Sequence, residues 1–100
     1  MGQDKSNRAF PFNEPGNVAV FTLKTIVFGG DPILHVTHDS DDSTWQFLGG
    51  GDAEEANAAL ISLSEILSLD PTIAELADLP LGWHAWRRSK NEPWQRATAK

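Results

Sequence analysis

The sequence predicts a small α+β domain in which an antiparallel sheet of about four strands is covered on one face by two or three short helices. Three observations carry this prediction. Short runs rich in β-branched and aromatic residues lie early and late in the chain. Helix-start signatures cluster between these runs. A chain of 100 residues is long enough for one domain with one modest core. Strands and helices grouped in this way are typical of α+β layers.

The first three strands follow from composition and turn signals. Residues 1–16 are polar, contain Pro and Gly, and are interpreted as a flexible N-terminal tail. A strand is expected at residues 18–24, where β-branched and aromatic residues are frequent. Two further strands, at residues 33–38 and 44–48, flank the turn-forming residues 39–43. We therefore expect these two strands to form a hairpin with a longer loop.

The middle of the chain is less uniform. The run AEEANAAL favours a helix by intrinsic propensity, and Leu60-Ile61 either continues that helix or forms a short strand. Ser62 followed by Glu65 is a capping box, in which each side chain accepts a hydrogen bond from the backbone of the other residue. This pattern predicts a helix over residues 63–69.

The last elements follow from a second helix start. Asp70-Pro71 places aspartate at an N-cap and proline at the first helical position, which predicts a helix that runs to about Asp78. A final strand is expected at residues 83–88. We interpret residues 17–88 as a single α+β domain and residues 89–100 as a polar C-terminal tail.

Charge is distributed unevenly along the chain. No lysine or arginine lies between Lys24 and Arg87, whereas most of the 14 acidic residues do, and the formal net charge is −6. A domain of this kind repels phosphate and attracts cations or basic proteins. We therefore expect no nucleic-acid partner. No apolar run approaches the roughly 20 residues that span a bilayer, and the chain has no cysteine. These features predict a cytoplasmic protein without a membrane partner.

An acidic run at the expected hairpin loop resembles the start of a calcium-binding loop. Asp39, Asp41 and Asp42 provide the oxygen ligands that hard cations prefer. An EF-hand would need glycine at the sixth position and glutamate at the twelfth, where Thr44 and Gly50 stand. We interpret the run as a solvated hairpin loop, with a loose divalent-cation site as the alternative.

The residue patterns favour no catalytic or cofactor site. His35 and His38 are expected on opposite faces of a strand, which disfavours shared metal ligation. The chain has no cysteine and no GxSxG elbow, and its glycine run lacks the lysine of a phosphate-binding loop. We predict a protein that is not an enzyme and that binds neither metal nor cofactor. The alternative is a small cation-binding domain or enzyme that uses carboxylates with His35, His38 or His84.

An ordered set of motifs covers about residues 20–88. Its members are Asp31-Pro32-Ile33, the stretch Asp42-Ser43-x-Trp45-x-Phe47 with Gly50 and Asp52 behind it, and the run from Leu63 to Arg87 with Asp70-Pro71 and Leu79-Pro80-Leu81-Gly82. In this order they resemble small bacterial domains of unknown function that are classed among the predicted immunity proteins of polymorphic toxin systems. The resemblance implies a toxin-binding role and no catalytic residues.

Taken with the charge layout, the resemblance predicts a non-catalytic domain that binds a basic, toxin-like protein through an acidic face. Complementary charge would steer such a partner into place. Trp83 and Trp86 cannot both face the core of one regular strand, so one indole is expected at the surface, where it would suit an interface. The expected partner-binding residues are Asp39, Asp41, Asp42, Glu54, Glu55 and Trp86. Self-assembly through an exposed strand edge or a tryptophan surface is a further alternative.

Overall fold

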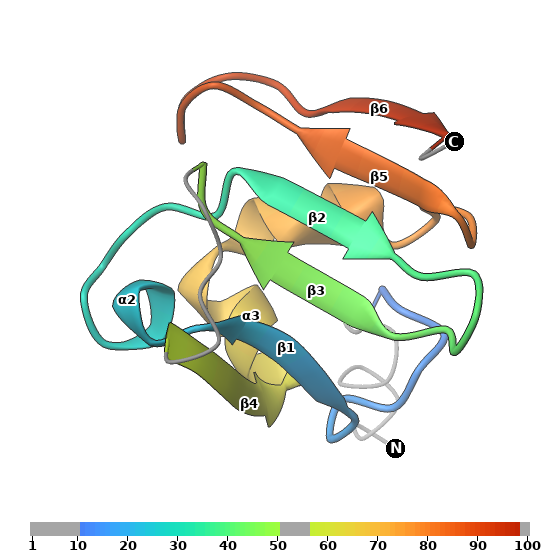
Figure 1. Ribbon diagram of the computed structural model, residues 1–100, viewed down its shortest axis with the longest axis horizontal. Helices are drawn as coiled ribbons and strands as arrows, with labels where there is room; N and C mark the ends of the chain where they lie inside the picture. Colours follow the sequence, from blue (N-terminus) through green and yellow to red (C-terminus); the bar gives the residue numbers. More distant parts are fainter. Residues whose placement is uncertain (1–10, 51–56, 99–100) are drawn as a thin grey trace, which may run out of the picture.

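The computed structural model describes residues 11–50 and 57–98. The fold is α+β, as predicted, with a sheet of six strands in the order β4-β1-β3-β2-β5-β6 (Figure 1). The strands are β1 (Ala19–Leu23), β2 (His35–His38), β3 (Trp45–Leu48), β4 (Ala58–Ser62), β5 (Trp83–Trp86) and β6 (Gln95–Thr98). The helical elements are α2 (Lys24–Val27), α3 (Leu63–Leu69) and the 3₁₀ helix η2 (Pro71–Leu76).

The predicted hairpin, capping box and aspartate cap are all present in the structure. Strands β2 and β3 form the expected antiparallel hairpin, with His38 opposite Trp45. At the start of α3, the Ser62 hydroxyl accepts a hydrogen bond from the Glu65 N–H at 3.1 Å, and the Glu65 carboxylate accepts one from the Ser62 N–H at 3.1 Å. Asp70 caps η2 by accepting a hydrogen bond from the backbone N–H of Thr72 at 3.0 Å.

The sheet differs from the expected one in strand number and direction. It is mixed rather than antiparallel, because β1 and β3 run parallel. The alanine-rich β4 is a strand rather than a helix because it pairs with β1 along its whole length, so long-range pairing overrides helix propensity. It lies at one edge of the sheet. The strand β6 lies within residues 89–100, the segment interpreted as a polar tail, and it pairs only with β5. The expected domain boundaries stay a prediction.

The core lies between the sheet and the helices α3 and η2, which cover one face of the sheet in Figure 1. Trp45 and Phe47 of β3 point into this layer and are buried, whereas Gln46 and Leu48 point the other way. The buried Thr22 hydroxyl donates a hydrogen bond to the Phe47 carbonyl at 2.7 Å, which joins the two parallel strands. No helix of the described residues lies over the opposite face of the sheet, which is called the uncovered face below. Within the described ranges, no helix has the length and hydrophobicity needed to cross a bilayer.

Candidate functional site

The loop between β2 and β3, residues 39–43, carries three of the predicted carboxylates and is called the acidic loop below. The Asp39 carboxylate accepts a hydrogen bond from the Asp41 N–H at 2.8 Å. The Asp42 carboxylate accepts hydrogen bonds from the hydroxyl and the N–H of Thr44, at 2.8 and 3.1 Å. These short turns, closed by side chain and backbone, fix the positions of the Asp39 and Asp42 carboxylates.

The carboxylates of the acidic loop have no cationic partner among the residues that the structure describes. Hydrogen bonds from the Thr44 hydroxyl and N–H hold the pKa of Asp42 below its ordinary value of 3.8, because they stabilise the ionised carboxylate. Across residues 11–50 and 57–98, the ion pairs involve Glu14, Asp70, Asp78 and Glu92, and none involves the acidic loop. Within these described ranges, no cation pairs with the negative charge of the loop.

A shallow groove of about 300 Å³ lies beside the acidic loop. Its lining includes Asp39 and Ser40 of the loop, together with Gly82 and Trp83. The turn that precedes β5 is held against the loop, because the Gly82 N–H donates a hydrogen bond to the His38 carbonyl at 2.7 Å. Gly82 has φ +82°, a conformation that glycine adopts without strain. Carboxylates thus stand next to a partly apolar depression.

Leu81 extends this depression toward the edge of the molecule. A second hollow, adjoining the first, is lined by Leu81, Trp83 and Thr98 among others. The Leu81 side chain is 51% exposed, and Trp83 is partly buried. Protein–protein interfaces have an apolar core and a polar rim. An exposed apolar side chain beside carboxylates matches this arrangement.

The structure does not bring Trp86 to the acidic loop. In the β2–β5 pairing, Trp83 stands opposite His38 next to the loop, whereas Trp86 stands opposite His35 at the other end of the strand. Three residues of extended strand separate the Cα atoms of the two tryptophans by about 10 Å. Trp86 is 38% exposed, so one indole of the pair does reach the surface, as expected.

The remaining predicted partner-binding residues are Glu54 and Glu55, and both lie outside the described residues. Their part in an acidic face stays a prediction.

The arginines that follow the acidic segment fold back onto the domain but leave the acidic loop open. Arg96 of β6 donates a hydrogen bond to the Asp78 carboxylate at 3.0 Å. Arg88 pairs with Glu92 at 3.6 Å on the surface. These two cations therefore pair with Asp78, just after η2, and with Glu92, rather than with the acidic loop.

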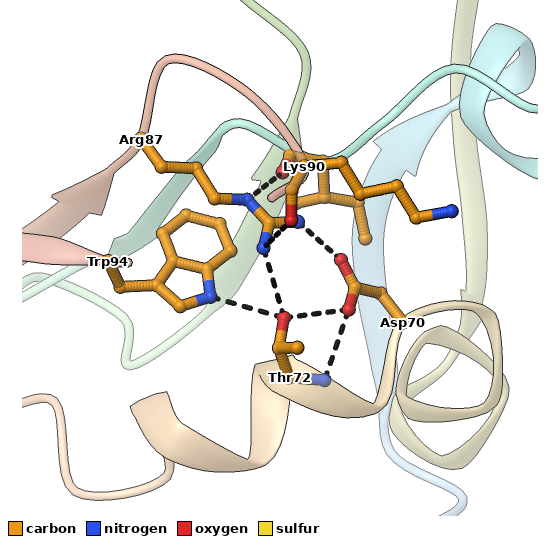
Figure 2. Close-up of polar contacts among 6 residues, drawn as sticks. Asp70, Thr72, Arg87, Lys90 and Trp94 are labelled. Atoms are coloured by element: carbon orange, nitrogen blue, oxygen red, sulfur yellow. Dashed lines mark hydrogen bonds and ion pairs between the residues drawn. The ribbon is translucent and has the colours of Figure 1, made fainter. Parts of the chain in front are cut away.

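Arg87 is buried in a polar cluster beneath the sheet, a role that sequence reasoning missed (Figure 2). Its guanidinium contacts the Asp70 carboxylate at 2.5 Å and the Thr72 hydroxyl at 3.1 Å. It also donates hydrogen bonds to the backbone carbonyls of Ile33 at 3.0 Å and Lys90 at 3.2 Å. The cluster joins the end of β5 to the start of η2, to the segment before β2 and to the segment before β6.

Trp94 closes this cluster from the C-terminal side. The Arg87 Cζ atom lies 4.1 Å from the centre of the Trp94 ring, and the indole N–H donates a hydrogen bond to the Thr72 hydroxyl at 3.3 Å. With both its charge and its hydrogen-bonding groups satisfied inside the protein, Arg87 has a structural role. Its only signal in the sequence was proximity to tryptophan and to other cations.

The three histidines divide between the two faces of the sheet, and the prediction that His35 and His38 point apart is confirmed. The His38 ring stacks on Trp45 at 3.9 Å in the core and hydrogen-bonds the Leu79 carbonyl at 2.7 Å. His35 instead meets His84 on the uncovered face, with ring nitrogens 3.1 Å apart. Among the described residues, no group of three or more histidine or acidic side chains is arranged to hold a metal ion.

The contact between His35 and His84 predicts a loss of stability in mild acid. Partial burial, and to a lesser degree the neighbouring His84, lower the pKa of His35 from its ordinary value of 6.5. As the pH falls through 6.5, the unfolded chain binds a proton that the folded protein resists, so stability present above that pH is lost below it. Urea unfolding of wild type and His35→Gln between pH 7.5 and 5 should show a smaller decline in the variant. Equal declines would contradict this account.

Comparison with known proteins places the fold and the loop in context. No curated protein and no solved structure matches the chain. Residues 35–98 match the sequence profile of the immunity protein Imm33 domain. This match begins at β2, includes the acidic loop and the groove, and extends through β6. The resemblance to predicted immunity proteins is thereby confirmed, and the chain belongs to the Imm33 immunity protein domain family.

Proposed function

We propose that the protein is a non-catalytic immunity protein that binds a toxin through the acidic loop and the groove beside it. Family membership supports the immunity role. The observation that carries the choice of surface is that the acidic loop, whose carboxylates have no cationic partner among the described residues, lies next to the exposed Leu81. The reducing interior of a bacterial cell suits a chain without cysteine.

The chemistry of this surface defines the partner. Carboxylates held by backbone hydrogen bonds need no reorganisation to meet lysine or arginine side chains of a partner. Charge of one sign steers a basic protein toward the loop and raises its association rate. Leu81 and Trp83 then offer apolar contact area, where most binding energy is expected to reside. A basic active-site region on a toxin, with an apolar side chain at its rim, fits this description.

Neutralising the acidic loop is expected to weaken toxin binding. In the variant Asp39→Asn/Asp41→Asn/Asp42→Asn, the amide oxygens still accept the hydrogen bonds that shape the loop, so only charge is lost. Exposed ion pairs contribute roughly 0.2–1 kcal/mol each, so the loss of three should lower affinity by roughly threefold to a hundredfold, mainly through slower association. Surface plasmon resonance against the basic toxin domains of the source bacterium, at low and high salt, measures both effects.

A control variant removes the same charge elsewhere. Asp31→Asn/Glu65→Gln/Glu75→Gln changes three exposed carboxylates away from the loop. This variant should bind the toxin nearly as well as wild type. The proposed surface is wrong if the control variant loses as much affinity as the loop variant, or if the loop variant binds as wild type does.

A further inference from the structure

The strand β4 forms one edge of the sheet and carries no charged residue. It pairs with β1 on one side, and no other described strand lies on its other side (Figure 1). Its sequence is Ala-Ala-Leu-Ile-Ser. Natural proteins normally protect an edge strand with charges, proline or a bulge, because its open backbone groups can pair with another strand. At the opposite edge, β6 contains Arg96 and follows Pro93.

Hydrogen-bond alternation shows which backbone groups of β4 face outward. The Leu63 N–H donates to the Val18 carbonyl at 2.9 Å, so this pair is one of the hydrogen-bonded pairs that continue the ladder between β4 and β1. Counting back by two from Leu63, Ile61 and Ala59 also hydrogen-bond to β1. The residues between them, Ala58, Leu60 and Ser62, direct their N–H and carbonyl groups away from β1. The Ser62 N–H is used by the Glu65 carboxylate. The N–H and carbonyl groups of Ala58 and Leu60 remain open along the described edge.

The side chains beside this open edge are apolar and exposed. Leu60 is 61% exposed, and its cross-strand neighbour Phe21 is 42% exposed, on the face of the sheet that no helix covers. Next to them, Ala58 is small and also exposed. A large side chain and a small one therefore alternate along the open edge.

We propose that β4 is a self-association site at which the β4 strand of a second copy adds antiparallel to the sheet. Centred on Ala59, this pairing sets Ala58 of each copy against Leu60 of the other, so that the open backbone groups of both residues are satisfied. The large side chain of one strand then lies beside the small one of its partner. The absence of charge from β4 matters, because two copies with a net charge of −6 repel each other and come closest where the contact surface is neutral.

A second copy fits this edge better than a strand from a basic protein, since β4 has no carboxylate to attract one. An interface made of one short strand from each copy buries less accessible surface than the roughly 1,200 Å² at the lower end of stable interfaces. We therefore expect a weak, reversible dimer. The dissociation constant is expected on the order of 0.1–1 mM. Because this interface uses no residue of the acidic loop, this proposal stands or falls independently of toxin binding.

Sedimentation equilibrium over a concentration series tests the proposal with two edge variants and one control. Leu60→Lys places a charge at an exposed position, and Ala58→Pro removes an outward N–H at the first position of the strand, where proline is tolerated. Gln95→Lys, on the other edge strand, is the matched control. Circular dichroism melts confirm that each variant is folded.

The average mass of wild type and Gln95→Lys should rise from 11.0 kDa toward twice that value as concentration increases. Both β4 variants should stay monomeric. In hydrogen exchange, the amides of Ala58 and Leu60 should become protected at high concentration in wild type. A monomeric wild type up to 1 mM would overturn the proposal, and so would association that both β4 variants retain or that Gln95→Lys abolishes.

Discussion

Replacing Arg87 with methionine should lower the free energy of unfolding by about 3–5 kcal/mol, because the change leaves a buried charge without its partner. The side chains of Arg87 and Asp70 are 1% and 10% exposed. Without the guanidinium, the Asp70 carboxylate loses its cation, and the Ile33 carbonyl loses a donor. Urea unfolding followed by circular dichroism measures the loss.

Two further variants distinguish the effect of breaking the buried ion pair from the effect of removing any arginine. Arg88→Met removes a neighbouring arginine whose side chain is 87% exposed, and it should change stability by less than about 0.5 kcal/mol. The double variant Arg87→Met/Asp70→Leu should recover part of the loss, because it removes the uncompensated charge as well. If Arg87→Met cost no more than Arg88→Met, the structural role of the cluster would be refuted.

Trp45→Ala should lower the free energy of unfolding by about 3–5 kcal/mol, the range for deleting a large buried aromatic side chain. Trp45 is 2% exposed and lies at the centre of an aromatic stack. Its ring lies 3.9 Å from His38, 5.9 Å from Phe47 and 5.2 Å from Phe12, and its indole N–H donates to the Glu14 carboxylate at 3.0 Å. The deletion leaves a cavity and removes a contact that holds the N-terminal segment.

Trp86→Ala provides the matched control for this deletion. Trp86 is 38% exposed on the uncovered face, so its removal should cost much less than that of Trp45. The two variants can be compared in one set of urea titrations at pH 7.5. Similar losses for both tryptophans would contradict the placement of Trp45 in the core.

The elements that could be predicted from the sequence are those specified by neighbouring residues. Ser62 and Glu65 lie three residues apart and satisfy each other's backbone, and α3 begins where this signature places it. Asp70 and Pro71 likewise start a helical element, although it is a 3₁₀ helix that ends at Leu76 rather than an α-helix to about Asp78. Such motifs need no information about the rest of the fold.

Elements that depend on distant pairing could not be predicted in the same way. The alanine-rich β4 is a strand because Ala58 to Ser62 pair with β1, about 40 residues earlier in the chain. The polar β6 offers no alternation of apolar residues and forms only against β5. The parallel pairing of β1 with β3 likewise joins residues such as Phe21 and Gln46 that no local pattern connects.

The candidate site shows the same division. The carboxylates of the acidic loop follow from their run in the sequence, and turn chemistry predicted that they would hydrogen-bond their own backbone. Which indole stands beside them depends on the register of β5 against β2, and this register places Trp83 rather than Trp86 at the loop. The pairing of Arg87 with Asp70, 17 residues earlier, follows no local pattern, and only the folded structure shows it.

The central proposal is that a toxin docks on the acidic loop and the groove beside it, and a hydrogen-exchange footprint of the complex tests this most directly. With a toxin that the protein binds present at saturation, amide exchange should slow at residues 39–43 and 81–83 and stay unchanged at residues 58–62. Protection confined to the β4 edge or to the uncovered sheet face, with none at the acidic loop, would contradict the proposal.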